Sequence, residues 1–122
     1  MLDGLSAYVK GVMGENAAAA YLAEKGMTEL FRRYRSPYGE IDLIMLEKET
    51  LVFVEVKARE RLSRTQALYA ITPAKQRRMM ETVRCFLGEH PECAGHMMRF
   101  DAITIAKDGI LHIPNAFEGQ AW

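Results

Sequence analysis

The stretch Gly39-Glu-Ile-Asp-Leu-Ile44, followed after a short polar segment by Leu51-Val-Phe-Val-Glu-Val-Lys57, decides the fold of this chain. Both runs are apolar and rich in branched residues, which is typical of β-strands. The polar residues Glu47-Lys-Glu-Thr50 separate them. A four-residue loop there predicts an antiparallel hairpin in which Leu46 pairs with Leu51.

That register places charged side chains opposite one another on one face of the hairpin. Asp42 would lie directly across from Glu55, and Glu40 across from Lys57. Facing Cβ atoms are roughly 4.5–5.5 Å apart, so two carboxylates there repel unless a cation lies between them. A hard divalent cation with oxygen ligands suits that position. Because side chains alternate along a strand, Glu55 and Lys57 share one face. Two acids and a lysine on one patch of sheet form a nuclease-like arrangement.

The composition predicts a single domain that spans residues 1–122, because 49% of the residues are hydrophobic and the length suits one core. No segment approaches the roughly 18 consecutive apolar residues needed to cross a bilayer, so we expect no membrane span. The N-terminus shows no signal-peptide pattern. Two cysteines, Cys85 and Cys93, give no disulfide framework, which favours a reducing cytoplasm.

The basic residues are unevenly distributed, although the net charge is zero. Residues 57–78 contain seven basic residues and one acid, Glu60. A positive face on a neutral chain favours binding to nucleic acid, with ordinary solvated arginines as the alternative. A second basic cluster consists of Arg32, Arg33 and Arg35. The candidates for contact with a nucleic-acid backbone are Arg59, Lys75, Arg77 and Arg78.

Apolar periodicity predicts two helices beside the hairpin. The first covers residues 5–25 and carries Glu15 on its apolar stripe with Ala19 and Ala23. A carboxylate in that position is expensive unless it is paired or binds a metal. The second begins at Thr72-Pro73 and runs to about residue 87, since threonine caps helices and proline suits their first position. Further strands are expected at 28–34, 98–106 and 110–113, with a loop or short helical piece at 59–69.

The resulting order is helix, three-strand meander, helix and strand, with one more short strand. The first three strands can pair in an antiparallel fashion, and the later strand can join them across a helix. This predicts an α/β fold with a central mixed sheet flanked by helices.

These residues and their order resemble the PD-(D/E)XK, or restriction-endonuclease-like, superfamily. More narrowly, the chain resembles the small bacterial YraN-like proteins, which are similar to archaeal Holliday-junction resolvases. An isolated Glu-x-Lys occurs everywhere, whereas the full set in this order is specific and spans nearly the whole chain. The matching segments are Gly11-x-x-Gly14-Glu15-x-x-Ala18-x-x-Tyr21-Leu22, Gly39-Glu-Ile-Asp42-Leu-Ile44, Val52-Phe-Val-Glu55-Val-Lys57-x-Arg59 and Arg99-Phe-Asp101.

The resemblance implies a role for each matching residue. Asp42 and Glu55 would bind Mg²⁺, with Mn²⁺ as a substitute, and the carbonyl of Val56 would add an oxygen ligand. Lys57 would orient the attacking water first and transfer protons second, and Glu15 would complete the site. The implied activity is hydrolysis of DNA phosphodiesters, including branched or flapped DNA, in repair or recombination, with a homodimer as one form of the protein.

The chain departs from the family pattern in two places. Ile41 replaces the proline that precedes the aspartate in the superfamily. The segment after Arg59 lacks a Phe-Gly pairing, so we expect residues 61–70 to be shaped differently.

Four other hypotheses stay open. The chain can be a catalytically weak or inactive nucleic-acid-binding module on the same fold, or a metal-free oligomerisation protein that uses an exposed sheet edge. The hairpin acids can also be a solvated surface in which Glu40 pairs with Lys57. A zinc site has the least support, because its candidate ligands do not match the usual paired spacing. Those candidates are Cys85, His90, Cys93 and His96.

Overall fold

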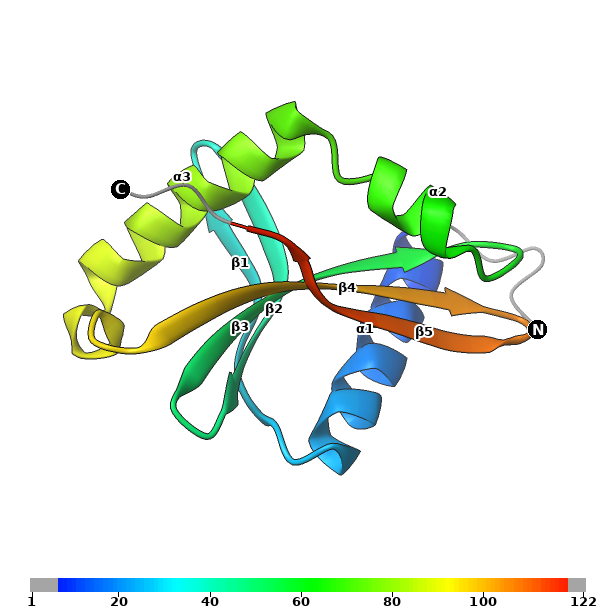
Figure 1. Ribbon diagram of the computed structural model, residues 1–122, viewed down its shortest axis with the longest axis horizontal. Coiled ribbons are helices and arrows are strands. Elements are labelled where there is room, and N and C mark those ends of the chain that lie inside the picture. The colour runs from blue at the N-terminus through cyan, green and yellow to red at the C-terminus, as the bar shows by residue number, and fades with distance from the viewer. Residues whose placement is uncertain (1–6, 119–122) are drawn as a thin grey trace.

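The computed structural model describes residues 7–118 and shows an α/β fold built on one five-stranded sheet (Figure 1). The strands lie in the order β1-β2-β3-β4-β5, and all neighbours are antiparallel except β3 and β4, which are parallel. The predicted mixed sheet flanked by helices is confirmed. The elements are α1 (Ala7–Glu24), β1 (Thr28–Ser36), β2 (Gly39–Glu47), β3 (Thr50–Ala58), α2 (Arg64–Tyr69), α3 (Pro73–Glu89), a 3₁₀ turn (Pro91–Cys93), β4 (Met97–Ala106) and β5 (Gly109–Phe117).

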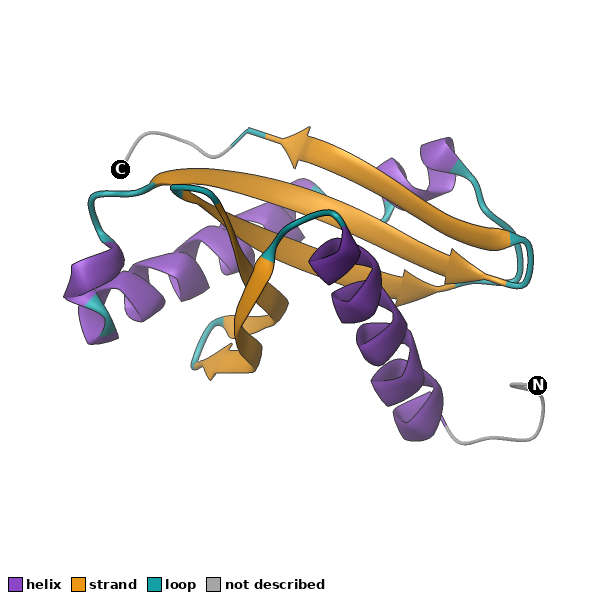
Figure 2. Cartoon of the chain, turned by 90° about the horizontal axis from the view of Figure 1, so that it is seen from below, coloured by secondary structure: helices purple, strands orange, loops and turns teal. Residues whose placement is uncertain are grey.

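Helices cover both faces of the sheet, with α1 on one side and α2 and α3 on the other (Figure 2). The alternation along β3 decides which residues meet which helix. Phe53 packs in the core that contains Phe86 of α3, and Val54 packs in the core that contains Leu22 of α1. A strand buried on both faces reads as a continuous apolar run, and this is why β3 has that sequence.

The β2–β3 hairpin has the predicted register but a shorter loop. Leu46 pairs with Leu51 as expected, and Glu47 pairs with Thr50, which leaves two residues in the turn. The ladder ends at the pair of Leu43 and Val54. The predicted main-chain pairs of Asp42 with Glu55 and of Glu40 with Lys57 are therefore wrong, because the two strands separate before they reach those residues.

The start of α3 is as predicted, since Thr72 Oγ1 accepts a hydrogen bond from the Lys75 N–H at 3.2 Å and Pro73 follows the cap. Residues 59–69, expected to be a loop or a short helical piece, contain the short helix α2, which Ser63 caps. Both helices lie on the same face of the sheet (Figure 1).

Two predicted elements differ from the structure. β5 continues to Phe117 rather than ending at Ile113, because Pro114 lies on an edge strand, where a missing N–H is tolerated. The buried side of α1 is centred on Ala18 and Leu22, whereas Ala23, expected on the apolar stripe, is exposed. Part of the first predicted helix lies outside the described residues. Within residues 7–118, no helix is long and apolar enough to cross a membrane.

Candidate active site

Asp42 lies where β2 separates from β3. Its carboxylate accepts a hydrogen bond from a main-chain N–H of β3 beyond the end of the β2–β3 ladder. Asp42 Oδ2 accepts from the Val56 N–H at 2.7 Å. Burial raises the pKa of Asp42 to about 7, and the negative charges of Glu55 and Glu15 add to the effect. At neutral pH the Asp42 carboxyl is therefore balanced between its neutral and charged forms, and a nearby cation would favour the carboxylate.

Glu55 is buried in β3 and has cationic partners from two elements. Lys75 of α3 forms a close ion pair with Glu55 Oε2. Lys57 Nζ, two residues along the same strand, lies 3.5 Å from the same oxygen. The side chain of Glu55 is 5% exposed, against 40% for Lys57. The buried carboxylate is thus compensated on its pocket side by two lysines.

A pocket of about 290 Å³ joins these residues. Three of the four predicted catalytic residues, Asp42, Glu55 and Lys57, line it together. Its wall is formed by the β2–β3 hairpin on one side and by the first turns of α3 on the other. The remaining lining residues are Gly39, Glu40, Val56, Lys75, Arg78 and Met79.

The hairpin register predicted that Glu40 lies across from Lys57, but the two residues do not pair. Glu40 accepts a hydrogen bond from Arg35 Nε at 2.7 Å. Arg35 lies directly opposite Glu40 in the β1–β2 ladder, so the nearer cation is on β1. Lys57 is thereby left to face Glu55 and the pocket.

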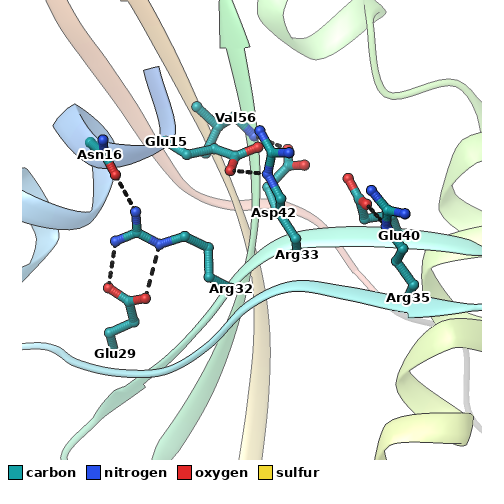
Figure 3. Close-up of polar contacts among 9 residues, drawn as sticks. All are labelled: Glu15, Asn16, Glu29, Arg32, Arg33, Arg35, Glu40, Asp42 and Val56. Atoms are coloured by element: carbon teal, nitrogen blue, oxygen red, sulfur yellow. Dashed lines mark hydrogen bonds and ion pairs between the residues drawn. The ribbon is translucent and has the colours of Figure 1, made fainter. Parts of the chain in front are cut away.

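Glu15, the fourth predicted catalytic residue, is buried on α1 and is held by Arg33 rather than by the pocket lysines (Figure 3). Arg33 Nε donates to Glu15 Oε1 at 2.7 Å. Arg33 has a φ of 52°, which is rare for a side-chain-bearing residue within a strand. Glu15 does not line the pocket, although its charge contributes to the raised pKa of Asp42. Figure 3 shows Glu15, Arg33 and Asp42 side by side.

The donor set fits a hard cation that keeps water in its coordination shell. Across residues 7–118, no three histidine, cysteine or acidic side chains converge into a complete metal cage. Mg²⁺ commonly binds through one or two carboxylates together with water and substrate phosphates. Asp42 and Glu55 supply two such carboxylates, and Val56, whose carbonyl is the predicted third donor, lines the same pocket.

The basic residues of the 57–78 segment divide into two groups. Lys75 and Arg78 line the pocket, whereas Arg59 and Arg77 are exposed outside it. Within the described part of the chain, Arg77 and Arg78 form no ion pair with an acid. These side chains are therefore available to a polyanion.

The second basic cluster is instead neutralised locally. Each of its arginines has an acidic partner at 2.7 Å, so the cluster adds little to a positive face. The pairs are Arg32 with Glu29, Arg33 with Glu15, and Arg35 with Glu40.

A buried charge cluster between β4 and β5 could not be predicted from spacing, although Arg99 and Asp101 belong to a matching motif. Asp101 Oδ1 and Oδ2 accept from Arg99 at 2.8 and 3.0 Å. His112 Nε2 lies 2.7 Å from Oδ2, and the Asn115 N–H donates to Oδ1 at 3.0 Å. Burial alone would raise the pKa of Asp101, but hydrogen bonds from His112 and Arg99 outweigh it and hold that pKa below its ordinary value. The sequence signal available for this cluster was a single acid, Asp101, in the otherwise apolar part of β4.

Among the four candidate zinc ligands, the two histidines make other contacts and the two cysteines are unpaired. The His90 ring packs 4.7 Å from that of Phe31 and 4.8 Å from that of Phe86, measured between centroids. His96 Nδ1 lies 3.2 Å from the Cys93 carbonyl oxygen. Cys85 and Cys93 are both free thiols.

The fold and the site define the class of protein: an α/β protein with a restriction-endonuclease-like core, whose hairpin acids and lysine meet beside a helix. The sequence matches the uncharacterised protein family UPF0102 over residues 14–105, and the chain belongs to that family. This confirms the YraN-like part of the resemblance.

Relatives of similar length support the assignment. A UPF0102 protein of Rhodopseudomonas palustris strain BisB18 is 44% identical over 119 residues, which cover 97% of this chain and 87% of the relative. A UPF0102 protein of Bradyrhizobium diazoefficiens is 42% identical over 119 residues, which cover 97% of this chain and 88% of the relative. A third, from Nitrobacter winogradskyi, is 42% identical over 95% of this chain and 98% of its own length.

Proposed function

We propose that this chain is a Mg²⁺-dependent nuclease that hydrolyses DNA phosphodiesters. The observation that carries the proposal is the pocket that joins Asp42, Glu55 and Lys57. Two crowded acids, one with a pKa raised to about 7, reduce the stability of the fold. Groups perturbed in this way are concentrated at functional sites.

The residues of the pocket divide the work of hydrolysis. Asp42 and Glu55, with the Val56 carbonyl, would hold Mg²⁺, which when bound supplies charge stabilisation at the phosphate and a more acidic water. Lys57 points its ammonium to the same pocket as the two acids. We assign it the orientation of the attacking water and a hydrogen bond to the scissile phosphate.

The substrate would be held mainly through its phosphates. Lys75 and Arg78 line the pocket, and Arg59 and Arg77 extend the basic surface around it. Contacts of this kind give binding that is tolerant of sequence and weakens as salt is raised. We infer that the substrate is DNA, including branched or flapped DNA, in repair or recombination.

The setting of this activity is also part of the proposal. We place the protein in the bacterial cytoplasm, since both cysteines are free thiols and a reducing compartment keeps thiols in that state. A homodimer, which would present two pockets to the two strands of a branched substrate, remains a prediction.

The test is cleavage of linear duplex, single-stranded, flapped and four-way-junction DNA with Mg²⁺ or Mn²⁺. Asp42→Ala and Lys57→Ala are the active-site variants, and Arg84→Ala, which removes the exposed ion pair of Arg84 with Glu81 outside the pocket, is the matched control. Cleavage that survives in the control and disappears in both active-site variants supports the proposal. Binding without cleavage that neither variant affects overturns it and favours a nucleic-acid-binding module.

A further inference from the structure

Glu55 already has a close cationic partner that comes from a different element. Lys75, on the first turn of α3, forms a close ion pair with Glu55 Oε2. The side chain of Glu55 is 5% exposed and that of Lys75 is 24% exposed, so the ammonium lies between the buried strand and the pocket. A carboxylate held in this way must exchange one cation for another before it can bind a metal.

We infer that Lys75 is a built-in counter-cation of the metal-free site, which a substrate phosphate draws away from Glu55, so that divalent cation and nucleic acid bind with positive cooperativity. The inference rests on the proposed function, because it concerns the same pocket. Two cations at one carboxylate oxygen repel each other strongly in a partly buried site, where salt and water screen charge poorly. A divalent ion and the Lys75 ammonium therefore compete for Glu55.

The pocket offers Lys75 a second position beside Arg78. The two residues are three apart on α3, so their side chains lie on the same face of the helix. Both line the pocket. A phosphate bound there would meet one ammonium and one guanidinium, which form strong charge-assisted hydrogen bonds to phosphate oxygens.

The exchange requires a change only in the side chain of Lys75. Its main-chain N–H is fixed by the hydrogen bond to Thr72 Oγ1 at 3.2 Å, and α3 itself is anchored in the core through Met79 and Phe86. Rotation about side-chain bonds is fast and leaves the helix in place. The scaffold of the site is therefore the same before and after the exchange.

Lys57 is less suited than Lys75 to be the exchangeable counter-cation of Glu55. Its Nζ lies 3.5 Å from Glu55 Oε2, whereas Lys75 is in close contact with that oxygen. Lys57 also belongs to the same strand as Glu55, so it stays beside the carboxylate when Lys75 leaves. This leaves Lys57 free to orient water while Lys75 contacts phosphate.

Thermodynamic linkage makes the coupling reciprocal. If bound nucleic acid raises the affinity for the divalent cation by some factor, the cation raises the affinity for nucleic acid by the same factor. The site would then bind the cation weakly until the substrate arrives.

The test is calorimetric titration of Mn²⁺ into the full chain, alone and with a four-way DNA junction that carries phosphorothioate linkages. The variants are Lys75→Met, which removes the counter-cation, and Lys75→Arg, which keeps a positive charge. Arg84→Met is the matched control, because Arg84 lies on the same helix outside the pocket and pairs with Glu81. Circular dichroism checks folding, and Lys75→Gln replaces Lys75→Met if that variant is unfolded.

Without DNA, Lys75→Met should bind Mn²⁺ about tenfold more tightly than the wild type, and Lys75→Arg and Arg84→Met should match the wild type. The junction should raise the wild-type affinity by a similar factor and that of Lys75→Met much less. Equal Mn²⁺ binding by wild type and Lys75→Met overturns the inference and leaves the nuclease proposal intact. An unchanged wild-type affinity on adding the junction overturns the coupling. Failure of every variant to bind Mn²⁺, with or without DNA, overturns both.

Discussion

Asp42 and Asp101 are both acids of central strands, yet their surroundings are opposite. Asp101 receives hydrogen bonds from Arg99, His112 and the Asn115 main chain, and its pKa is held below the ordinary value. Asp42 accepts one main-chain hydrogen bond from Val56, and burial together with the charge of Glu55 raises its pKa to about 7. The partners of Asp101 favour its ionised form, whereas burial and the neighbouring Glu55 charge disfavour the ionised form of Asp42.

The two acids therefore differ in their effect on stability. The contacts of Asp101 stabilise the fold, whereas the burial of Asp42 beside Glu55 costs stability. Two of the cations that line the pocket, Lys57 and Lys75, pair with Glu55. Consistency across packing, charge and hydrogen bonding is the rule for structural residues, and local departures from it mark functional sites. By this criterion the β4–β5 cluster is structural and the β2–β3 pocket is the candidate functional site.

The contrast between Asp42 and Asp101 predicts the largest change in folding stability at Asp101. Asp101→Asn should lower the free energy of unfolding by about 3–5 kcal/mol at pH 7, because it removes the buried carboxylate that Arg99 and His112 both contact. The pKa of Asp101 is lowered in the folded state, so this contribution is present above the unfolded pKa and is lost as pH falls through the folded one.

Urea unfolding at pH 7 measures this effect. Glu47→Gln is the control, since Glu47 contacts the same arginine at 2.9 Å but its side chain is 35% exposed. That change should lower stability by less than about 1 kcal/mol. Equal losses for Asp101→Asn and Glu47→Gln would show that the buried cluster has no special structural weight.

The second-largest effect is expected at Asp42, where substitution should raise rather than lower the free energy of unfolding. Its folded pKa, about 7, is above its ordinary value, so the folded state binds the proton more tightly and loses stability as pH rises from about 4 to 7. Asp42→Asn removes that loss. Without divalent cations the variant should be more stable than the wild type by roughly 3–4 kcal/mol at pH 8 and about equally stable at pH 4, at about 1.4 kcal/mol for each pH unit.

Unfolding curves collected between pH 4 and 8 check this prediction. A constant difference between Asp42→Asn and the wild type across that range would contradict the raised pKa. Asp101→Asn gives the contrasting profile, in which the variant is the less stable protein at neutral pH.

The third effect comes from the cation itself. Mg²⁺ or Mn²⁺ at about 100 times its dissociation constant should stabilise the wild type by about 2.7 kcal/mol. Glu55→Gln should abolish the shift in melting temperature, and Glu47→Gln should retain it. A shift of the same size in Glu55→Gln would place the cation elsewhere on the protein.

The smallest effect concerns the helix that carries Lys75. Thr72→Ala removes the cap of α3 and should lower stability by about 1 kcal/mol. Ser63→Ala removes the corresponding cap of α2, a helix without buried residues, and should have a smaller effect. Chemical unfolding of both variants measures the difference, and a larger loss for Ser63→Ala would contradict the view that α3 anchors the pocket.

The sequence predicted the parts of this structure that depend on local pattern. Apolar runs and a polar turn were sufficient for the register of Leu46 and Leu51, and a threonine–proline pair was sufficient for the start of α3. The approach of Asp42 and Glu55 to one pocket followed from that register, although the main-chain pair between them did not form.

The remaining features depend on contacts between distant segments. Arg33 reaches Glu15 through a left-handed backbone conformation that residue preferences disfavour for arginine. Lys75 reaches Glu55 only because α3 docks across the hairpin, and the Asn115 N–H reaches Asp101 only because β5 continues past Pro114. Spacing along the chain carries no signal for such pairs.

The most direct test of the central claim is a crystal structure of the wild-type protein grown with Mn²⁺ and measured at a wavelength where manganese scatters anomalously. We expect an anomalous peak in the pocket, coordinated by the carboxylates of Asp42 and Glu55, and no such peak in Asp42→Asn crystals. A manganese peak elsewhere, or an empty pocket at saturating Mn²⁺, would contradict that claim.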